Sequence, residues 1–260
     1  MTRQCYVDHG KKIVVFWAPK SGCTSIVDIF AEGVLEGRWE LKGKAYSRKD
    51  LVYFGYHHNY RQAYQLLRSG EGYKSIAVLR DPYDRAVSGY IEKFVRHSSG
   101  RPILTCDDME PFARKTYMNI CEHHGLGVAD GITFRQFVDY ICDCVSKRME
   151  SLDHHFNSQV PHFYREVGFS YDYLYRLSSF PDFVEKLSEL SGNDIDVVHK
   201  RTNKAVIDQD QSGEDYSGAT NFNLAAIDGG INRRQFNDVG CMDRMTKDFS
   251  DDYFYFDKGC

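Results

Sequence analysis

The chain has 260 residues, of which 42% are hydrophobic and 14% are aromatic, so it is long enough to bury a full hydrophobic core. Its formal net charge at pH 7 is −4, which argues against nucleic acid as the main partner, because surfaces that bind a phosphate backbone are usually basic. No run of residues has the length and apolar character of a membrane span.

The first predicted element is a strand over residues 12–18, which are mostly apolar. The sequence PKSGCTS follows at 19–25, and apolar residues then recur at helical spacing over 25–36. A lysine, a glycine and several hydroxyl groups at a strand-to-helix turn are typical of a phosphate-binding loop, because free backbone N–H groups and the helix dipole converge there on one anion. The sequence therefore predicts an anion-binding loop at 19–25.

A second apolar strand is predicted over 74–79, followed by the sequence RDPYDRAVSGY at 80–90, whose proline suits the first turn of a helix. Arg80 stands at the carboxyl end of the strand, the edge at which open α/β sheets bind ligands, and Ser88 follows about two helical turns later. We predict a second anion site at Arg80 and Ser88. Arg85 shares the helix face of Ser88 and suits either this site or a structural ion pair.

Further helices are predicted downstream, and the acidic, Gly- and Ser-rich stretch 208–219 indicates a loop. The predicted helices cover 108–121, 133–147 and 181–191, and the aromatic stretch 248–256 is expected to pack against the domain. Strands that alternate with helices predict an α/β fold with a central parallel sheet flanked by helices on both faces. We expect one domain over 1–260.

The two anion-binding segments together resemble the 5′-phosphosulfate loop and the 3′-phosphate motif of sulfotransferases that use 3′-phosphoadenosine 5′-phosphosulfate (PAPS). Their wording is closest to the Golgi-type carbohydrate sulfotransferases and their bacterial relatives. The resemblance implies a P-loop-like three-layer sandwich, with a PAPS-binding core over about 12–96 and acceptor-side and closing elements over about 97–260. It also implies that PAPS is the donor, that PAP is the product and that no metal is required.

The resemblance assigns roles to the residues of both motifs. Lys20 would stabilise the charge that builds on the leaving phosphate. Arg80 and Ser88 would hold the 3′-phosphate, which separates this donor from ATP-type nucleotides. The residues expected to contact the donor are Lys20, Ser21, Gly22, Cys23, Thr24, Ser25, Arg80 and Ser88, joined by Arg201 and Lys204 from a late basic segment that resembles the one closing over the donor.

A general base is also needed, because an acceptor hydroxyl has too high a pKa to attack unaided. In the resembling enzymes the base is a histidine followed three positions later by a tyrosine, between the two phosphate motifs. His57 with Tyr60 reproduces that spacing, and the neighbouring His58 is the second candidate. Residues 153–159 resemble a D-x-H-[WF]-x-x-Q stretch on the acceptor side, which makes His155 and Gln159 candidate substrate contacts.

The expected acceptor is a hydroxyl of an oligosaccharide or glycoconjugate, although a tyrosine or a small metabolite also fits. Residues 175–180 depart from the family's usual glutamate-containing segment, so the acceptor is not fixed by the resemblance. The rival function is a P-loop kinase or other NTPase. The residue order argues against it, because Lys20 precedes the loop glycine, whereas a Walker A lysine follows the second glycine. A nucleotide-binding module without activity is a third reading.

The remaining expectations concern metals and the compartment. A zinc site built from His123, His124, Cys142 and Cys144 would match none of the usual ligand spacings, so we expect no metal. Nothing near Met1 has the order of a signal peptide. If Met1 is the natural first residue, we expect a cytosolic protein with reduced cysteines; if an anchor precedes it in the full-length protein, we expect the Golgi lumen.

Overall fold

The computed structural model describes residues 4–34, 57–149, 151–195, 215–227 and 231–260. Contacts between residues divide the chain into two compact units. The first comprises the described residues of Met1–Asp81, Gln159–Thr202 and Phe254–Cys260, and the second those of Pro82–Ser158 and Asn203–Tyr253. Of the described helices, none is long and apolar enough to cross a membrane.

The first unit is built on a five-stranded sheet with the strand order β3-β1-β2-β4-β5. The strands are β1 (Gln4–Asp8), β2 (Ile13–Phe16), β3 (His57–Asn59), β4 (Lys74–Leu79) and β5 (Tyr173–Arg176). Strands β2, β4 and β5 are parallel, as the sequence predicts for a central parallel sheet. The unpredicted β1 makes the sheet mixed, since it pairs antiparallel with both β2 and β3.

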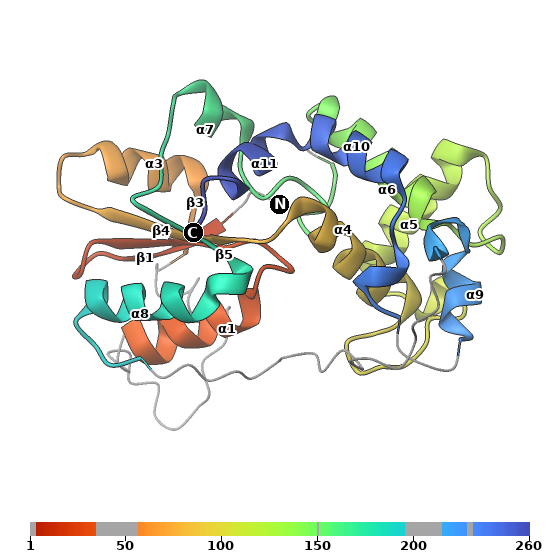
Figure 1. Cartoon of the computed structure of the whole chain (residues 1–260), viewed down its shortest axis with the longest axis horizontal. Coiled ribbons are helices and arrows are strands. Elements are labelled where there is room, and N and C mark those ends of the chain that lie inside the picture. The colour runs from red at the N-terminus through yellow and green to blue at the C-terminus, as the bar shows by residue number, and fades with distance from the viewer. Residues whose placement is uncertain (1–3, 35–56, 150, 196–214, 228–230) are drawn as a thin grey trace. The chain divides into compact units, whose positions relative to one another are not determined.

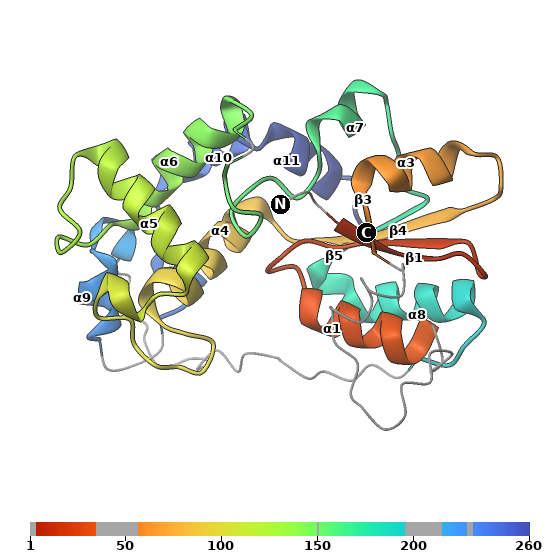
Figure 2. The same cartoon turned by 180° about the vertical axis from the view of Figure 1, so that it is seen from behind.

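Helices cover both faces of this sheet, so the first unit has three layers (Figures 1 and 2). One face packs against α1 (Cys23–Asp28), its π-helical continuation (Ile29–Val34) and α8 (Phe180–Ser191). The other face packs against α3 (Tyr60–Arg68), α7 (His162–Glu166) and the end of α11 (Ser250–Phe256).

Each face of the sheet has its own hydrophobic core beneath its helices, because successive side chains along a strand point to opposite faces. Val15 and Ile76 lie in the core beneath α1 and α8. Their strand neighbours Phe16 and Ala77 lie in the core beneath α3 and α7. The predicted α/β fold with helices on both faces of the sheet is confirmed.

The second unit is helical and packs around one aromatic-rich core. Its helices are α4 (Pro82–Tyr90), which continues as a π-helical turn (Ile91–Val95), α5 (Pro111–His124), α6 (Phe134–Ser146), α9 (Asn221–Ala225) and α10 (Val239–Asp248). This unit also has short 3₁₀ turns at Cys106–Asp108, Tyr216–Gly218 and Arg233–Gln235. The first unit has one at Leu177–Ser179. The helix predicted over 133–147 therefore forms nearly where the apolar spacing placed it, and Pro82 opens α4 as predicted.

Candidate functional site

The predicted anion-binding loop leaves the carboxyl end of β2 and turns sharply before α1. Lys20 has φ of 68° and Gly22 has φ of 80°, both in the left-handed region. Position 22 favours glycine for two reasons. Its φ is positive, and a Cβ there would lie 3.3 Å from a methyl carbon of Leu177 and 3.4 Å from the ring of Phe180. The backbone N–H of Ser21 donates to the carbonyl of Ala18 at 3.2 Å, which closes the turn.

Arg80 stands beside this loop, although sixty positions separate it from Lys20. It follows β4, which runs parallel to β2 with Phe16 opposite Ala77, so both segments leave the same edge of the sheet. The Nη1 of Arg80 donates a hydrogen bond to the carbonyl oxygen of Lys20 at 3.2 Å. The structure thus brings the loop and the predicted 3′-phosphate arginine together.

Gln159 lies between these two segments rather than on an open surface. Its side chain is buried, with 1% of its surface exposed. The amide oxygen accepts hydrogen bonds from the Ser21 hydroxyl at 2.7 Å and from the Arg80 backbone N–H at 3.1 Å. The amide nitrogen donates to the Arg80 carbonyl at 2.8 Å. The sequence places Gln159 among the acceptor contacts, and that role stays a prediction.

The segment of the predicted base begins at the edge strand β3. His57 pairs with Tyr6 and His58 with Cys5 of β1. Tyr60 opens α3, and its hydroxyl donates to the carbonyl of Trp17, the residue that follows β2, at 2.9 Å. This bond ties the start of α3 to the edge from which the anion-binding loop emerges.

The ring of His58 points to a different neighbour. Its centroid lies 5.3 Å from that of His9, and Nδ1 of His9 is 2.7 Å from the Tyr73 hydroxyl. His9 follows the carboxyl end of β1, which is antiparallel to β2, and Tyr73 precedes β4, so both lie at the amino-terminal edge of the parallel strands. The ring of His58 thus packs against His9, while its backbone pairs with Cys5, which lies opposite Phe16 at the end of β2 that leads into the anion-binding loop.

In the second unit, Arg85 is a structural brace. It is 3% exposed, and its guanidinium donates to the carbonyls of Asn157, His154 and His155 at 2.7, 3.1 and 3.2 Å. These bonds hold the segment 154–157 through its backbone carbonyls, and a role of Arg85 at the second anion site stays a prediction. Ser88 is half-buried in α4, and its role in holding the 3′-phosphate stays a prediction.

His155 is held by an aspartate that the sequence analysis did not single out. Nδ1 of His155 lies 2.7 Å from Oδ1 of Asp153, which also accepts the His155 backbone N–H at 2.9 Å, and the His155 ring stacks on Phe112 at 4.5 Å. Burial acts to raise the pKa of Asp153, but these hydrogen bonds and the charges of His154 and His155 outweigh it, so the pKa lies below its usual range. The D-x-H spacing was the available signal for this pair.

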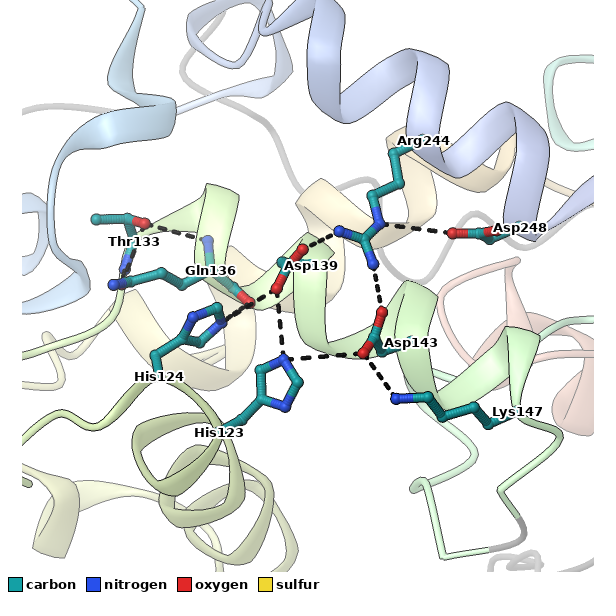
Figure 3. Close-up of polar contacts among 9 residues, drawn as sticks. All are labelled: His123, His124, Thr133, Gln136, Asp139, Asp143, Lys147, Arg244 and Asp248. Carbon is teal, nitrogen blue, oxygen red and sulfur yellow. Dashed lines mark hydrogen bonds and ion pairs between the residues drawn. The ribbon is translucent and has the colours of Figure 1, made fainter.

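A second group of histidines lies on α5, where the contacts are those of an ion-pair network (Figure 3). Nε2 of His123 and of His124 approach Asp139 of α6 at 3.4 and 3.7 Å, and Nε2 of His124 also donates to a carbonyl, that of Gln136, at 3.0 Å. Arg244 of α10 pairs with the same Asp139. The Asp139 carboxylate is thus shared between the histidines and the guanidinium, so the network joins α5, α6 and α10.

The cysteines near these histidines point elsewhere. Cys142 and Cys144 are 0% and 2% exposed in the core of the second unit, where burial raises the pKa of both thiols. Two groups of described residues have side chains close enough to share a cation, His123, His124 and Asp139 in one and Asp153, His154 and His155 in the other, and neither includes a cysteine.

The predicted donor contacts Arg201 and Lys204 lie outside the described residues.

One known protein family matches almost the whole chain. The model of the sulfotransferase family matches residues 3–258. No curated protein and no solved structure matches. The match includes both anion-binding segments, the β3 segment and the Gln159 segment. The chain therefore belongs to the sulfotransferase family, and it is a transferase enzyme.

Proposed function

We propose that the protein transfers the sulfuryl group of PAPS to a hydroxyl acceptor, with the donor bound at the carboxyl edge of β2 and β4. The observation that carries this proposal is the hydrogen bond between Arg80 and the Lys20 carbonyl, which brings the two phosphate motifs of the family together at one edge of a parallel sheet. The donor contacts are then Lys20 and residues 21–25 for the 5′-phosphosulfate, and Arg80 with Ser88 for the 3′-phosphate.

The proposed reaction is an in-line displacement at sulfur. The acceptor oxygen forms a bond to sulfur while the bond from sulfur to the bridging oxygen of PAPS breaks, and PAP leaves with the electron pair of that bond. Lys20 is proposed to neutralise the charge on the departing oxygen, together with backbone N–H groups of the loop. No metal ion is assigned a part in this step.

His57 is the proposed general base that takes the acceptor proton. Tyr60, three positions later, supports this choice because its bond to Trp17 ties the segment to the end of β2. His58 is the second candidate, since its ring packs against that of His9. His155 is a further candidate, because Asp153 fixes its Nδ1 and so orients the ring.

The proposed acceptor is a hydroxyl of an oligosaccharide or glycoconjugate. This follows from the wording of the two phosphate motifs, which is closest to that of the carbohydrate enzymes of the family. A screen of glycans, tyrosine peptides and small hydroxylated metabolites with labelled PAPS would identify the acceptor. Label transferred only to a peptide tyrosine or a small metabolite would reject the carbohydrate proposal.

Calorimetry with PAP and ADP tests the donor site. PAP should bind more tightly, because only PAP carries the 3′-phosphate proposed to contact Arg80 and Ser88. Arg80→Ala should chiefly weaken PAP binding, whereas Lys20→Ala should lower turnover more than affinity, because its contact strengthens as charge moves onto the leaving oxygen. Equal affinity for PAP and ADP, or activity that needs ATP and Mg²⁺, would overturn the proposal in favour of a kinase.

A further inference from the structure

We propose that Gln159 is a positioning residue that fixes the two donor-binding segments relative to each other; this rests on the proposed function. Its amide bonds to both of them, reaching Ser21 in the anion-binding loop and Arg80 at the end of β4. Ser21 is itself 0% exposed, so this contact is shielded from water. The two bonds to Arg80 extend the hydrogen bonding of β4 by one residue beyond its last strand position.

The position requires both a donor and an acceptor on one side chain. The Arg80 carbonyl needs an N–H or O–H donor, while the Arg80 N–H and the Ser21 hydroxyl donate to an acceptor. A neutral primary amide supplies both in one plane. It also adds no negative charge beside segments proposed to bind a polyanion, whereas an ionised glutamate of the same length would repel the donor.

These bonds determine what the side chain does in the folded enzyme. Fixing the Arg80 backbone fixes the origin of its guanidinium, and fixing Ser21 holds the loop between Lys20 and Gly22. Removing the amide would leave buried polar groups of Ser21 and Arg80 without this partner, and the loop would relax to satisfy them. The expected loss is therefore in donor affinity and in the placement of Lys20.

Two substitutions separate this role from a merely structural one. Gln159→Met keeps the length of the side chain and removes all three hydrogen bonds. Gln159→Glu keeps the acceptor, but it restores the donor to the Arg80 carbonyl only when the carboxyl is protonated. Gln235→Met is the matched control, because Gln235 is a buried glutamine, 4% exposed, whose amide oxygen caps a 3₁₀ turn in the second unit.

The test is calorimetric titration with PAP from pH 5 to pH 8, with each variant expressed relative to wild type at the same pH. Gln159→Met should lose about tenfold to a hundredfold in affinity at every pH. Gln159→Glu should show a similar loss at pH 8 that shrinks as the pH falls and the carboxyl takes up a proton. Gln235→Met should bind PAP as wild type does.

A double-mutant cycle keeps the inference falsifiable if one variant folds poorly. Ser21→Ala should weaken PAP binding in the wild-type background and add little in the Gln159→Met background, because the Ser21 hydroxyl has already lost its bond to residue 159 there. Wild-type affinity in folded Gln159→Met and Gln159→Glu, or a pH-independent loss in Gln159→Glu, overturns the positioning role alone. Absence of PAP binding by the wild type overturns the proposed donor, and this inference with it.

Discussion

Asp172, which precedes β5, should stabilise the pairing of β4 with β5 in a pH-dependent manner. Its Oδ2 accepts hydrogen bonds from the Ser75 backbone N–H at 2.8 Å and from the Ser75 hydroxyl at 2.7 Å, and its Oδ1 lies 3.1 Å from Nζ of Lys74. Ser75 is 1% exposed, so a buried N–H loses its partner if the carboxylate is removed. These contacts set the start of the parallel register, in which Ile76 lies opposite Tyr173.

The magnitude follows from the contacts. A hydrogen bond to a charged acceptor contributes about 1.5–3 kcal/mol and an exposed ion pair less than about 1 kcal/mol. Because the Asp172 side chain is 31% exposed, the lower values apply. Asp172→Ala should therefore lower the free energy of unfolding by about 2–4 kcal/mol. Asp172→Asn, which keeps an acceptor oxygen but loses the charge, should cost about 1–2 kcal/mol.

The pH dependence has a defined sign. Burial acts to raise the pKa of Asp172, but the bonds from Ser75 and the contact with Lys74 outweigh it, so the pKa is lowered in the folded state. A lowered pKa means that the charge stabilises the fold above the unfolded-state value of about 3.9, and that this contribution is lost as the pH falls through the folded-state pKa.

Urea denaturation of wild type and Asp172→Asn at pH 7, 5, 4 and 3 measures this contribution. The difference in midpoint should be constant from pH 7 to pH 5 and should shrink below about pH 4. Asp107→Asn is the control, because Asp107 is 85% exposed and pairs only at the surface with Arg114 at 3.3 Å. A difference for Asp172→Asn that stays as large at pH 3 as at pH 7 would refute the reasoning.

Three further substitutions test the loop, the base segment and the ion-pair network. Gly22→Ala should lower the thermal midpoint and PAP affinity more than Gly100→Ala, because both glycines have positive φ but a Cβ contacts neighbours only at position 22; equal effects would mean that strain alone matters. Tyr60→Phe should lower the free energy of unfolding by about 1 kcal/mol, measured by urea denaturation, because the Trp17 carbonyl loses this donor. It should also lower kcat if His57 is the base, and an unchanged kcat would show that Tyr60 has no part in catalysis. Arg244→Met should cost about 1 kcal/mol in dilute salt and less in 1 M NaCl, measured by thermal denaturation, whereas a salt-independent loss would indicate packing rather than charge.

Local signals in the sequence were sufficient for the elements next to the two motifs. The strand predicted over 74–79 is β4 residue for residue, because its apolar run ends at a charged residue and a proline that begins a helix. The strand predicted over 12–18 is shorter, as β2, because residues 17–18 already belong to the turn. Strands β1 and β5, five and four residues long, were not predicted, because neither is followed by a phosphate-binding motif that marks its end in the sequence.

The candidate site, like the fold, was predicted from the sequence only in part. The motifs locate Lys20 and Arg80, because each follows its own strand in the sequence. The bonds of Gln159 could not be predicted, since they join positions 138 and 79 residues apart and depend on which strands are neighbours in the sheet. The predicted segments 208–214 and 201–204 lie outside the described residues and add nothing to this comparison.

The distribution of charge explains why neutral braces surround the proposed donor site. The chain has a net charge of −4, so its long-range field does not attract a polyanionic donor, and binding must come from short-range contacts. Such contacts require the cationic groups to be held in place before the donor arrives, because ordering them on binding would reduce the affinity. Backbone carbonyls and amides can do this without cancelling charge, as the Lys20 carbonyl does for the guanidinium of Arg80 and the Gln159 amide does for its backbone. A carboxylate in place of the Lys20 carbonyl would hold the guanidinium but would oppose the phosphate that the arginine is proposed to bind. A carboxylate in place of the Gln159 amide would also lack the donor to the Arg80 carbonyl.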